Sequence, residues 1–227
     1  MILKLKLFFV FIWFSTISNL IMANNPCEWW DFCLDSSVSY DLFAQWLGDV
    51  DASSRVAVRN HLKKQAYDTI LDIPCGLCTD YFGLKKDTIN ILYKGMDYSI
   101  KLVQKAQKNN IDVKQGDIEN IDHPENSFDV IYCRHILEHL KHYNKAMDEV
   151  IRIAKKEVII VFFIKPSMDE DDFINLVFLN GHSVYHNRYS QKKFIQYVLS
   201  REKVREIFWE NIEGNEIIAH ILLKNEN

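Results

Sequence analysis

Apolar runs separated by amphipathic stretches predict strands that alternate with helices along most of this chain. Four such runs lie at residues 69–73, 89–93, just before 116–118, and at 128–133. A fifth run, Val158–Ile164, is apolar almost throughout, as expected of a strand buried on both faces. Near the C-terminus, Val204–Trp209 and Glu216–Leu223 flank a Glu-Gly-Asn turn and predict a hairpin.

Helical spacing of apolar residues fills the intervals between these runs. It predicts helices over residues 40–47 and 56–62, the second capped by Ser53 or Ser54, and over Asn144–Ala154. A last helix is expected from a Ser190 cap to about Ser200. Strands that alternate with helices and end in a hairpin predict a doubly wound α/β sheet.

Acidic residues mark the ends of the first two predicted strands. Asp72 ends the first strand just before a turn at Pro74 and Gly76, and Asp97 follows Gly76 by 21 positions. Open α/β sheets bind ligands outside the carboxyl ends of their strands, and an acid about 20 residues beyond the first turn suits a ribose. The two acids favour a nucleotide-type ligand. The alternative interpretation is an ordinary strand that ends in a turn and binds nothing.

These acids belong to a set of four motifs in order, completed by Gly116-Asp117-Ile118 and by the segment from Phe128-Asp129 to Leu137-Glu138-His139. The set resembles the class I S-adenosylmethionine-dependent methyltransferases, closely over roughly residues 65–165. The resemblance implies a Rossmann-like, mostly parallel seven-stranded sheet with an antiparallel C-terminal strand and helices on both faces. It also implies methyl transfer as the activity and S-adenosylmethionine as the cofactor.

The resemblance assigns roles along this cofactor. Asp97 would accept hydrogen bonds from both ribose hydroxyls, Tyr98 would pack against adenine, and Asp117 would accept from the adenine amino group. Arg134 would balance the cofactor carboxylate. The predicted cofactor-binding residues are Asp72, Pro74, Cys75, Gly76, Asp97, Tyr98, Ser99, Asp117, Ile118, Cys133, Arg134 and His135.

Pro74 and Cys78 stand where the family usually has two of the glycines of its first turn. Proline fixes φ and removes a donor, and cysteine adds bulk where the backbone often approaches the cofactor. A domain that binds the cofactor without catalysis is therefore a second interpretation. The intact Asp97 and Asp117 weigh against it.

The region after the fifth strand faces the acceptor in this family, which places His182, His186, Arg188 and Tyr189 near the substrate. His186 and Tyr189 are the candidates for a general base, although a polar surface loop accounts for such residues equally well. A base is needed only if the acceptor must lose a proton. The predicted acceptor is a small molecule of unidentified type.

Two other kinds of chemistry fit part of the chain. Cys75 and Cys78, placed between a strand and a helix, match a thiol redox motif, which would lower a thiol pKa. His135 and His139 are four residues apart and suggest a metal pair. No third ligand lies at a suitable spacing, so the sequence predicts no metal site. A nicotinamide-dependent enzyme is disfavoured because the first turn lacks Gly-x-Gly-x-x-Gly.

Two features before the first strand carry weaker predictions. Trp29, Trp30 and Phe32 are expected to pack under a helix rather than to line a substrate entrance. Arg55 and Arg59 share one predicted helical face, which we expect to be solvated rather than to bind an anion.

With 227 residues, 48% of them hydrophobic, the chain can form one large core. We divide it into an apolar N-terminal segment (1–23), a helical cap (24–64) and a methyltransferase domain (65–227). The net charge of -4 gives no basic bias, so no nucleic-acid partner is expected. Five scattered cysteines do not form the framework of a small secreted domain and are expected to be thiols.

Residues 1–23 place Lys4 and Lys6 before an apolar stretch, as a signal or anchor segment does. Alternatively, translation starts at Met22 and the protein is cytoplasmic, where S-adenosylmethionine is made. Membrane contact is expected only if the apolar segment is retained. The sequence does not predict an oligomeric state.

Overall fold

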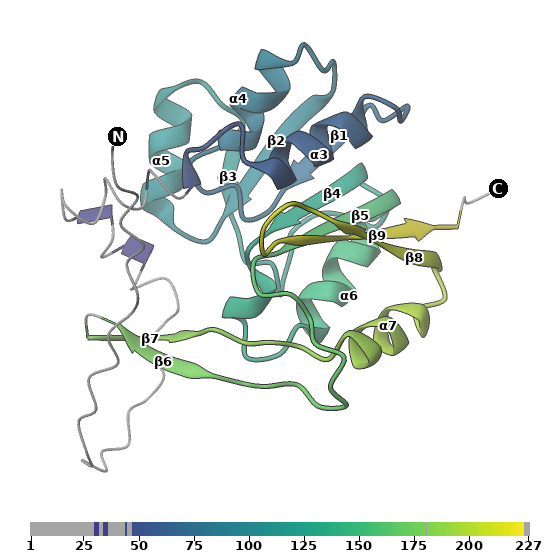
Figure 1. Cartoon of the computed structure of the whole chain (residues 1–227). Helices are drawn as coiled ribbons and strands as arrows, with labels where there is room; N and C mark the ends of the chain where they lie inside the picture. Colours follow the sequence, from purple (N-terminus) through teal and green to yellow (C-terminus); the bar gives the residue numbers. More distant parts are fainter. Residues whose placement is uncertain (1–29, 32–33, 36–43, 45–46, 180, 225–227) are drawn as a thin grey trace, which may run out of the picture.

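The computed structural model describes residues 30–31, 34–35, 44, 47–179 and 181–224. Within this part of the chain, seven strands form one sheet in the order β3-β2-β1-β4-β5-β9-β8 (Figure 1). Strands β1 to β5 run parallel, whereas β9 is antiparallel to both β5 and β8. Across the sheet the bounds are β3 (Val113–Gln115), β2 (Leu92–Asp97), β1 (Thr69–Asp72), β4 (Phe128–Arg134), β5 (Ala154–Phe162), β9 (Ile217–Leu223) and β8 (Val204–Asn211).

The strand order reverses at β1, which has β2 on one side and β4 on the other. Asp72, at the end of β1, lies opposite Gly95 of β2 and Tyr132 of β4. The carboxyl ends of these parallel strands therefore meet at one edge of the sheet. The predicted doubly wound sheet with an antiparallel C-terminal strand is confirmed.

Helices cover both faces of the sheet (Figure 1). One apolar cluster joins side chains of α3, α4 and α5 to one face, and another joins α6 and α7 to the opposite face. All seven residues of β4 are buried, which explains why residues 130–133 in its middle show no alternation of apolar and polar side chains. The helices are α3 (Ser53–Leu62), α4 (Thr79–Lys86), α5 (Ile100–Lys108), α6 (Asn144–Ile153), α7 (Gln191–Leu199) and the 3₁₀ turn η1 (Leu137–His139).

A separate hairpin, β6 (Leu176–Leu179) and β7 (His182–Tyr185), stands apart from the main sheet (Figure 1). The sequence analysis did not predict it. Its first strand reads Leu-Val-Phe-Leu, so its sequence lacks the alternation of apolar and polar residues that reveals a half-buried strand. Gly181, with φ +88°, supplies the left-handed residue in its turn.

The helix caps confirm one prediction and correct another. Ser190 caps α7, and its side chain accepts a hydrogen bond from the Lys193 N–H. The predicted cap of α3 was wrong, because Ala52 occupies the N-cap position without a side-chain hydrogen bond, and Ser53 and Ser54 lie inside the helix.

The predicted helix over residues 40–47 and the apolar segment 1–23 lie outside the described residues, apart from Ala44 and Leu47. In the described part of the chain, no helix combines the length and the apolar character needed to cross a membrane.

The two serines make a matched test of these caps. We expect Ser190→Ala to lower the free energy of unfolding by about 1 kcal/mol, because one N–H of α7 loses its partner. Ser53→Ala should change it by less than about 0.5 kcal/mol, because Ser53 is exposed and caps nothing. Urea unfolding of the two variants measures the difference, and equal effects would contradict the assigned cap.

Candidate functional site

A cavity of about 510 Å³ opens where the carboxyl ends of β1, β2 and β4 meet. Its size lies in the range of about 300–1,000 Å³ that is usual for small-molecule sites, and its position is the one where open α/β sheets bind ligands. Most of the predicted site residues line it. These are Pro74, Cys75, Gly76, Asp97, Tyr98, Ser99, Asp117, Ile118, Arg134, His135 and His186.

Asp97, the last residue of β2, is the most strongly held acid of the cavity. Its two carboxylate oxygens accept hydrogen bonds from the Gly76 N–H and the Ser99 N–H, each at 2.9 Å. Burial raises the pKa of Asp97 to about 6, and these backbone donors limit the rise. Both oxygens keep a lone pair for further donors, as a ribose diol would require.

The turn after β1 approaches the cavity with its backbone. Gly76 has φ +53°, a left-handed conformation that glycine adopts without strain. Cys78 is also left-handed, at φ 57°, but its side chain is fully buried in the apolar cluster under α3 and α4. The side chain of Cys78 therefore lies away from the cavity. A cysteine in place of the usual glycine does not narrow the cavity.

Asp72 and Cys133 were predicted to bind the cofactor. This prediction was wrong, because neither residue lines the cavity. The Asp72 carboxylate is buried and accepts from the Tyr93 hydroxyl at 2.8 Å. Burial raises its pKa to about 7. Cys133 is fully buried in the core on the face covered by α6. The next residue, Arg134, faces the other way and reaches the cavity, as expected of successive strand positions.

The residues after Asp97 and after β3 complete the inner wall. Tyr98 is half-exposed at the cavity, and the Ser99 hydroxyl donates to Asp31 at 2.6 Å. Asp117 lies beside the buried Ile118. It also accepts from the Glu119 N–H at 2.9 Å, so the turn-forming role and the place in the cavity coexist.

Arg134 and His135 share one acid. Arg134 Nη2 donates to Glu216 Oε1 at 2.6 Å, and His135 Nε2 lies 2.5 Å from the same oxygen. Burial lowers the pKa of His135 to about 4, although Glu216 opposes this shift. The chain itself thus supplies a counterion for Arg134, the residue predicted to balance the cofactor carboxylate.

Arg55 and Asp80 form a charged pair that the sequence analysis missed. The Arg55 guanidinium donates to the Asp80 carboxylate, and both residues line the cavity. Arg59 pairs with Asp87 at 2.8 Å. Both arginines are buried between α3 and α4, so the predicted solvated face was wrong. The four-residue spacing of Arg55 and Arg59 correctly predicted that they share one helical face. It did not predict the acids with which they pair.

Aromatic rings form the opposite end of the cavity. His139 lies 5.2 Å from the Trp30 ring, 5.1 Å from the Phe163 ring and 5.3 Å from the His186 ring, centre to centre. All four line the cavity. Trp30 also packs against Leu102 of α5, as predicted, whereas Trp29 and Phe32 lie outside the described residues.

The buried carboxylate of Glu138 positions the residues of this aromatic end. Its Oε1 accepts from the Phe163 N–H at 2.6 Å and from the Ile164 N–H at 3.2 Å, which ties η1 to the chain after β5. Burial raises the pKa of Glu138 to about 7. His139 is held by an Nδ1 contact of 2.8 Å with the Tyr185 carbonyl, so hairpin β6–β7 also positions the rings.

The two candidate bases have different places. His186 is half-buried at the cavity, and burial lowers its pKa below the usual value, so its imidazole is neutral at pH 7. Tyr189 is a correction. It is 1% exposed, and its single hydroxyl proton lies between two acceptors, the carbonyls of Leu137 and Leu140, at O···O distances of 2.8 and 2.7 Å. It packs behind the site and does not line the cavity.

The remaining polar residues of this region lie apart from the cavity lining. Arg188 is exposed and pairs with Asp169 at 3.4 Å, and His182 belongs to β7. His135 and His139, four residues apart, do not lie on one regular helix. His135 has φ 57°, and the 3₁₀ turn begins only at Leu137.

The sheet order, the cavity at its reversal point and the acids around it define a Rossmann-like domain that binds a small molecule. Known proteins agree. Residues 71–162 match a family model described as a methyltransferase domain. This match supports the resemblance to the class I S-adenosylmethionine-dependent methyltransferases, a family whose cofactor is S-adenosylmethionine.

Over 125 residues the chain is 27% identical to an uncharacterized protein of Methanocaldococcus jannaschii. The match covers 55% of this chain and 52% of that protein, so the chain spans about half the length of this relative. The fold resembles a protein of Pyrococcus horikoshii, with 15% identity, a TM-score of 0.60, and coverage of 83% of this chain and 100% of the other. It also resembles DesVI of Streptomyces venezuelae, with 14% identity, a TM-score of 0.61, and coverage of 82% and 97%.

The lining residues fit the chemistry of the cofactor. Asp97 and Asp117 offer carboxylate acceptors for hydroxyl and amino groups, and Ile118 offers an apolar contact between them. At the other side, Arg55, Asp80 and Arg134 line the cavity and present both signs of charge, as an amino acid group requires. Glu216, the partner of Arg134, is not among the lining residues.

The thiols do not have the properties of a redox pair. Cys75 and Cys78 are 6% and 0% exposed. Hydrogen bonding to Cys78 and burial raise the pKa of Cys75 well above its usual value. A redox-active thiol needs a lowered pKa and access to its partner.

We therefore expect both thiols to resist iodoacetamide at pH 7 in the folded protein and to react when urea unfolds it. Mass spectrometry of the tryptic peptide that contains Cys75 and Cys78 measures the labelling. Rapid labelling of the native protein, or a disulfide between the two after mild oxidation, would support the redox interpretation instead.

Proposed function

We propose that the protein transfers a methyl group from S-adenosylmethionine to a small-molecule acceptor that carries a planar or aromatic group. The observation that supports this is the continuity of one cavity, which joins the acids at the ends of β2 and β3 to a cluster of four rings. The acids suit the cofactor, and the rings of Trp30, His139, Phe163 and His186 suit a flat acceptor.

We infer that Asp97 holds the ribose hydroxyls and that Asp117 and Ile118 contact the adenine. Tyr98, half-exposed beside them, can lie along the adenine ring. When bound, S-adenosylmethionine supplies a methyl group on a sulfonium, which is already a good leaving group. The protein then has mainly to position the acceptor and exclude water.

At the aromatic end, His186 is the residue proposed to accept a proton. Its neutral imidazole can take the proton that an acceptor hydroxyl or amine loses. His139 is less suited to this role because burial lowers its pKa to about 3. Its Nδ1 already contacts the Tyr185 carbonyl. It therefore serves as a wall and a hydrogen-bond partner.

The state of Asp97 predicts how cofactor binding depends on pH. Because the pKa of Asp97 is about 6, the acceptor carboxylate is mostly present at pH 7 and mostly protonated at pH 5. The affinity for S-adenosylhomocysteine should therefore fall about tenfold as the pH is lowered from 7 to 5. Isothermal calorimetry at the two pH values measures this change.

Asp97→Asn is the control, since it removes the titrating group with little change in volume, although its NH2 replaces one of the oxygens that accept from Gly76 and Ser99. It should bind at least tenfold more weakly at pH 7 and lose the pH dependence. Asp72 and Glu138 also titrate near pH 7 and remain in this variant. If Asp97→Asn kept the full pH dependence of binding, the titrating group would be Asp72 or Glu138 and not Asp97. Well-folded protein without any binding would reject the proposed function.

The role of His186 predicts a loss of rate without a loss of cofactor binding. With an acceptor that must be deprotonated, His186→Asn should lower kcat by about 10²- to 10⁴-fold and leave the Kd for S-adenosylhomocysteine unchanged. A screen of phenols, catechols and aromatic amines with a coupled assay for S-adenosylhomocysteine supplies the acceptor. The loss should be smallest for an acceptor that needs no deprotonation.

Tyr189→Phe is the matched control for the other candidate base. Its hydroxyl contacts only the chain, so the variant should lose about 1 kcal/mol of stability and keep its kcat. If Tyr189→Phe lost activity as strongly as His186→Asn, the assignment of the base would be wrong.

A further inference from the structure

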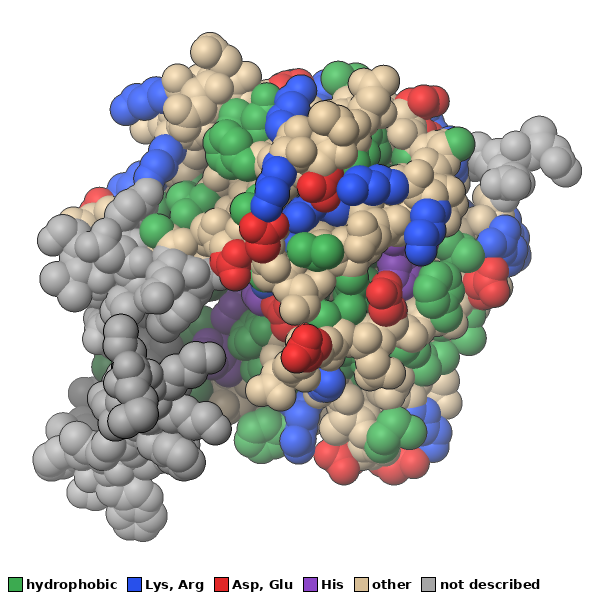
Figure 2. All heavy atoms as spheres, turned by 45° about the horizontal axis from the view of Figure 1, so that its top comes forward, with side chains coloured by type: hydrophobic (Ala, Val, Ile, Leu, Met, Phe, Trp, Pro, Cys, Tyr) green, Lys and Arg blue, Asp and Glu red, His purple; other side chains and the backbone are tan. Residues whose placement is uncertain are grey.

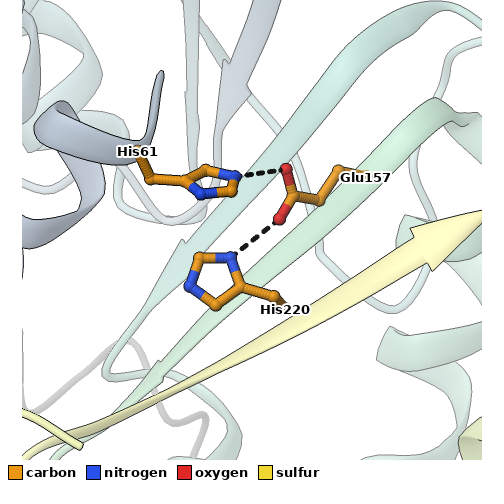
Figure 3. A group of neighbouring side chains, drawn as sticks. All are labelled: His61, Glu157 and His220. Carbon is orange, nitrogen blue, oxygen red and sulfur yellow. Dashed lines mark hydrogen bonds and ion pairs between the residues drawn. The ribbon is translucent and has the colours of Figure 1, made fainter. Parts of the chain in front are cut away.

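Three side chains converge on the face of the sheet that α3 covers (Figure 3). His61 comes from α3, Glu157 from β5 and His220 from β9. His61 Nε2 lies 2.8 Å from Glu157 Oε2, and His220 Nδ1 lies 2.8 Å from Glu157 Oε1. The possible ligand atoms of the three side chains all lie within 4.8 Å of one another. None of the three lines the cavity of the proposed active site.

Two outer residues hold this cluster. The Tyr67 hydroxyl donates to Glu157 Oε2 at 2.6 Å. On the far side of the His220 ring, Nε2 lies 3.2 Å from Glu210 Oε2. Metal-binding histidines usually donate their second ring N–H to a carboxylate, and metal-binding carboxylates usually accept a further hydrogen bond. Both kinds of support are present here.

The two nitrogens of the His220 ring have more hydrogen-bond acceptors around them than a neutral imidazole can serve. It is fully buried, and each of its nitrogens faces a carboxylate oxygen. A neutral imidazole has a single N–H, so it can donate to one of these acids only. The other nitrogen then directs a lone pair at an oxygen. A cation between His220 Nδ1 and Glu157 removes that repulsion and leaves the Nε2–H to Glu210.

We propose that His61, Glu157 and His220 bind a divalent transition-metal ion, with zinc as the best match. Two imidazoles and one carboxylate are a usual zinc ligand set, and they suit magnesium or calcium poorly. Ligand atoms about 2.1 Å from zinc in a tetrahedron lie about 3.4 Å apart, so only small movements are needed. Glu210 and Tyr67 are positioning residues of this site.

An ion can reach the site from solvent. A surface depression beside α3 is lined by Asn60, His61, Lys64 and Glu210 among others. The His61 side chain is 16% exposed, whereas those of Glu157 and His220 are completely buried. The fourth ligand position would therefore face this depression and take a water molecule. Because the ligands come from a helix and two strands, the ion would fasten α3 to the sheet.

The test uses the full chain without an affinity tag, freed of metal with a chelator. Titration with Zn²⁺ by calorimetry, together with elemental analysis after gel filtration, should give one ion per chain, and the midpoint of thermal unfolding should rise. Mg²⁺ should produce neither effect. Absence of stoichiometric Zn²⁺ uptake would overturn the proposal and indicate that a proton is the cation between His220 and its acids.

Variants separate this site from other zinc-binding groups. His61→Ala, at the edge of the cluster, should weaken Zn²⁺ binding at least 100-fold and abolish the thermal shift, and Glu210→Gln should weaken it about 10-fold or more. His142→Ala removes an exposed histidine elsewhere and should change nothing. Uptake that survives His61→Ala in folded protein would place the zinc on other histidines or on cysteines and would overturn the assignment.

Discussion

The carboxylate of Asp97 is the contact on which the ligand cavity depends. It ends β2, and its two oxygens accept from the backbone of Gly76, in the turn after β1, and of Ser99, which caps α5. One buried acid thus fixes three chain segments relative to one another. A buried carboxylate is tolerated only with such donors. The left-handed conformation at Gly76 is what directs that N–H toward Asp97.

Around this acid, the two arginines that line the cavity each have an acidic partner. Arg55 is paired with Asp80, and Arg134 with Glu216. An unpaired buried charge costs several kcal/mol, so a guanidinium can face the cavity because an acid beside it offsets its desolvation. These two pairs carry both signs of charge with little net charge. It matches a zwitterionic ligand group better than a simple anion.

The sequence predicted the scaffold and much of the site for a physical reason. Strand ends, turns and the acids that follow them are local features, and parallel strands bring their ends together without further information. Which side a strand residue faces was harder to predict. In β4, residues 130–133 show no alternation of apolar and polar side chains, so the pattern did not indicate that Cys133 faces the core while Arg134 lines the cavity. Asp72 likewise lay at the right place in the chain with its side chain turned to Tyr93.

Contacts between distant segments were not predictable from local pattern. The partners of Arg55 and of His61 lie 25 and 96 residues further along the chain. No spacing rule spans such intervals, and hairpin β6–β7 lacked the alternation that would have revealed it. Tyr189 looked like a candidate base because it stood among polar residues. Its hydroxyl in fact lies buried against the carbonyls of Leu137 and Leu140, contacts that no local pattern indicated.

Helix α3 connects the cavity with the His61–Glu157–His220 cluster. Arg55 in its first turns lines the cavity, and His61 near its end belongs to the cluster, six residues or about 9 Å further along the axis. Between them, Arg59 binds Asp87 of the segment after α4. A rotation of α3 that moved His61 would therefore also move Arg55. An ion bound at one end of this helix would hold the charged wall of the cavity at the other end in place.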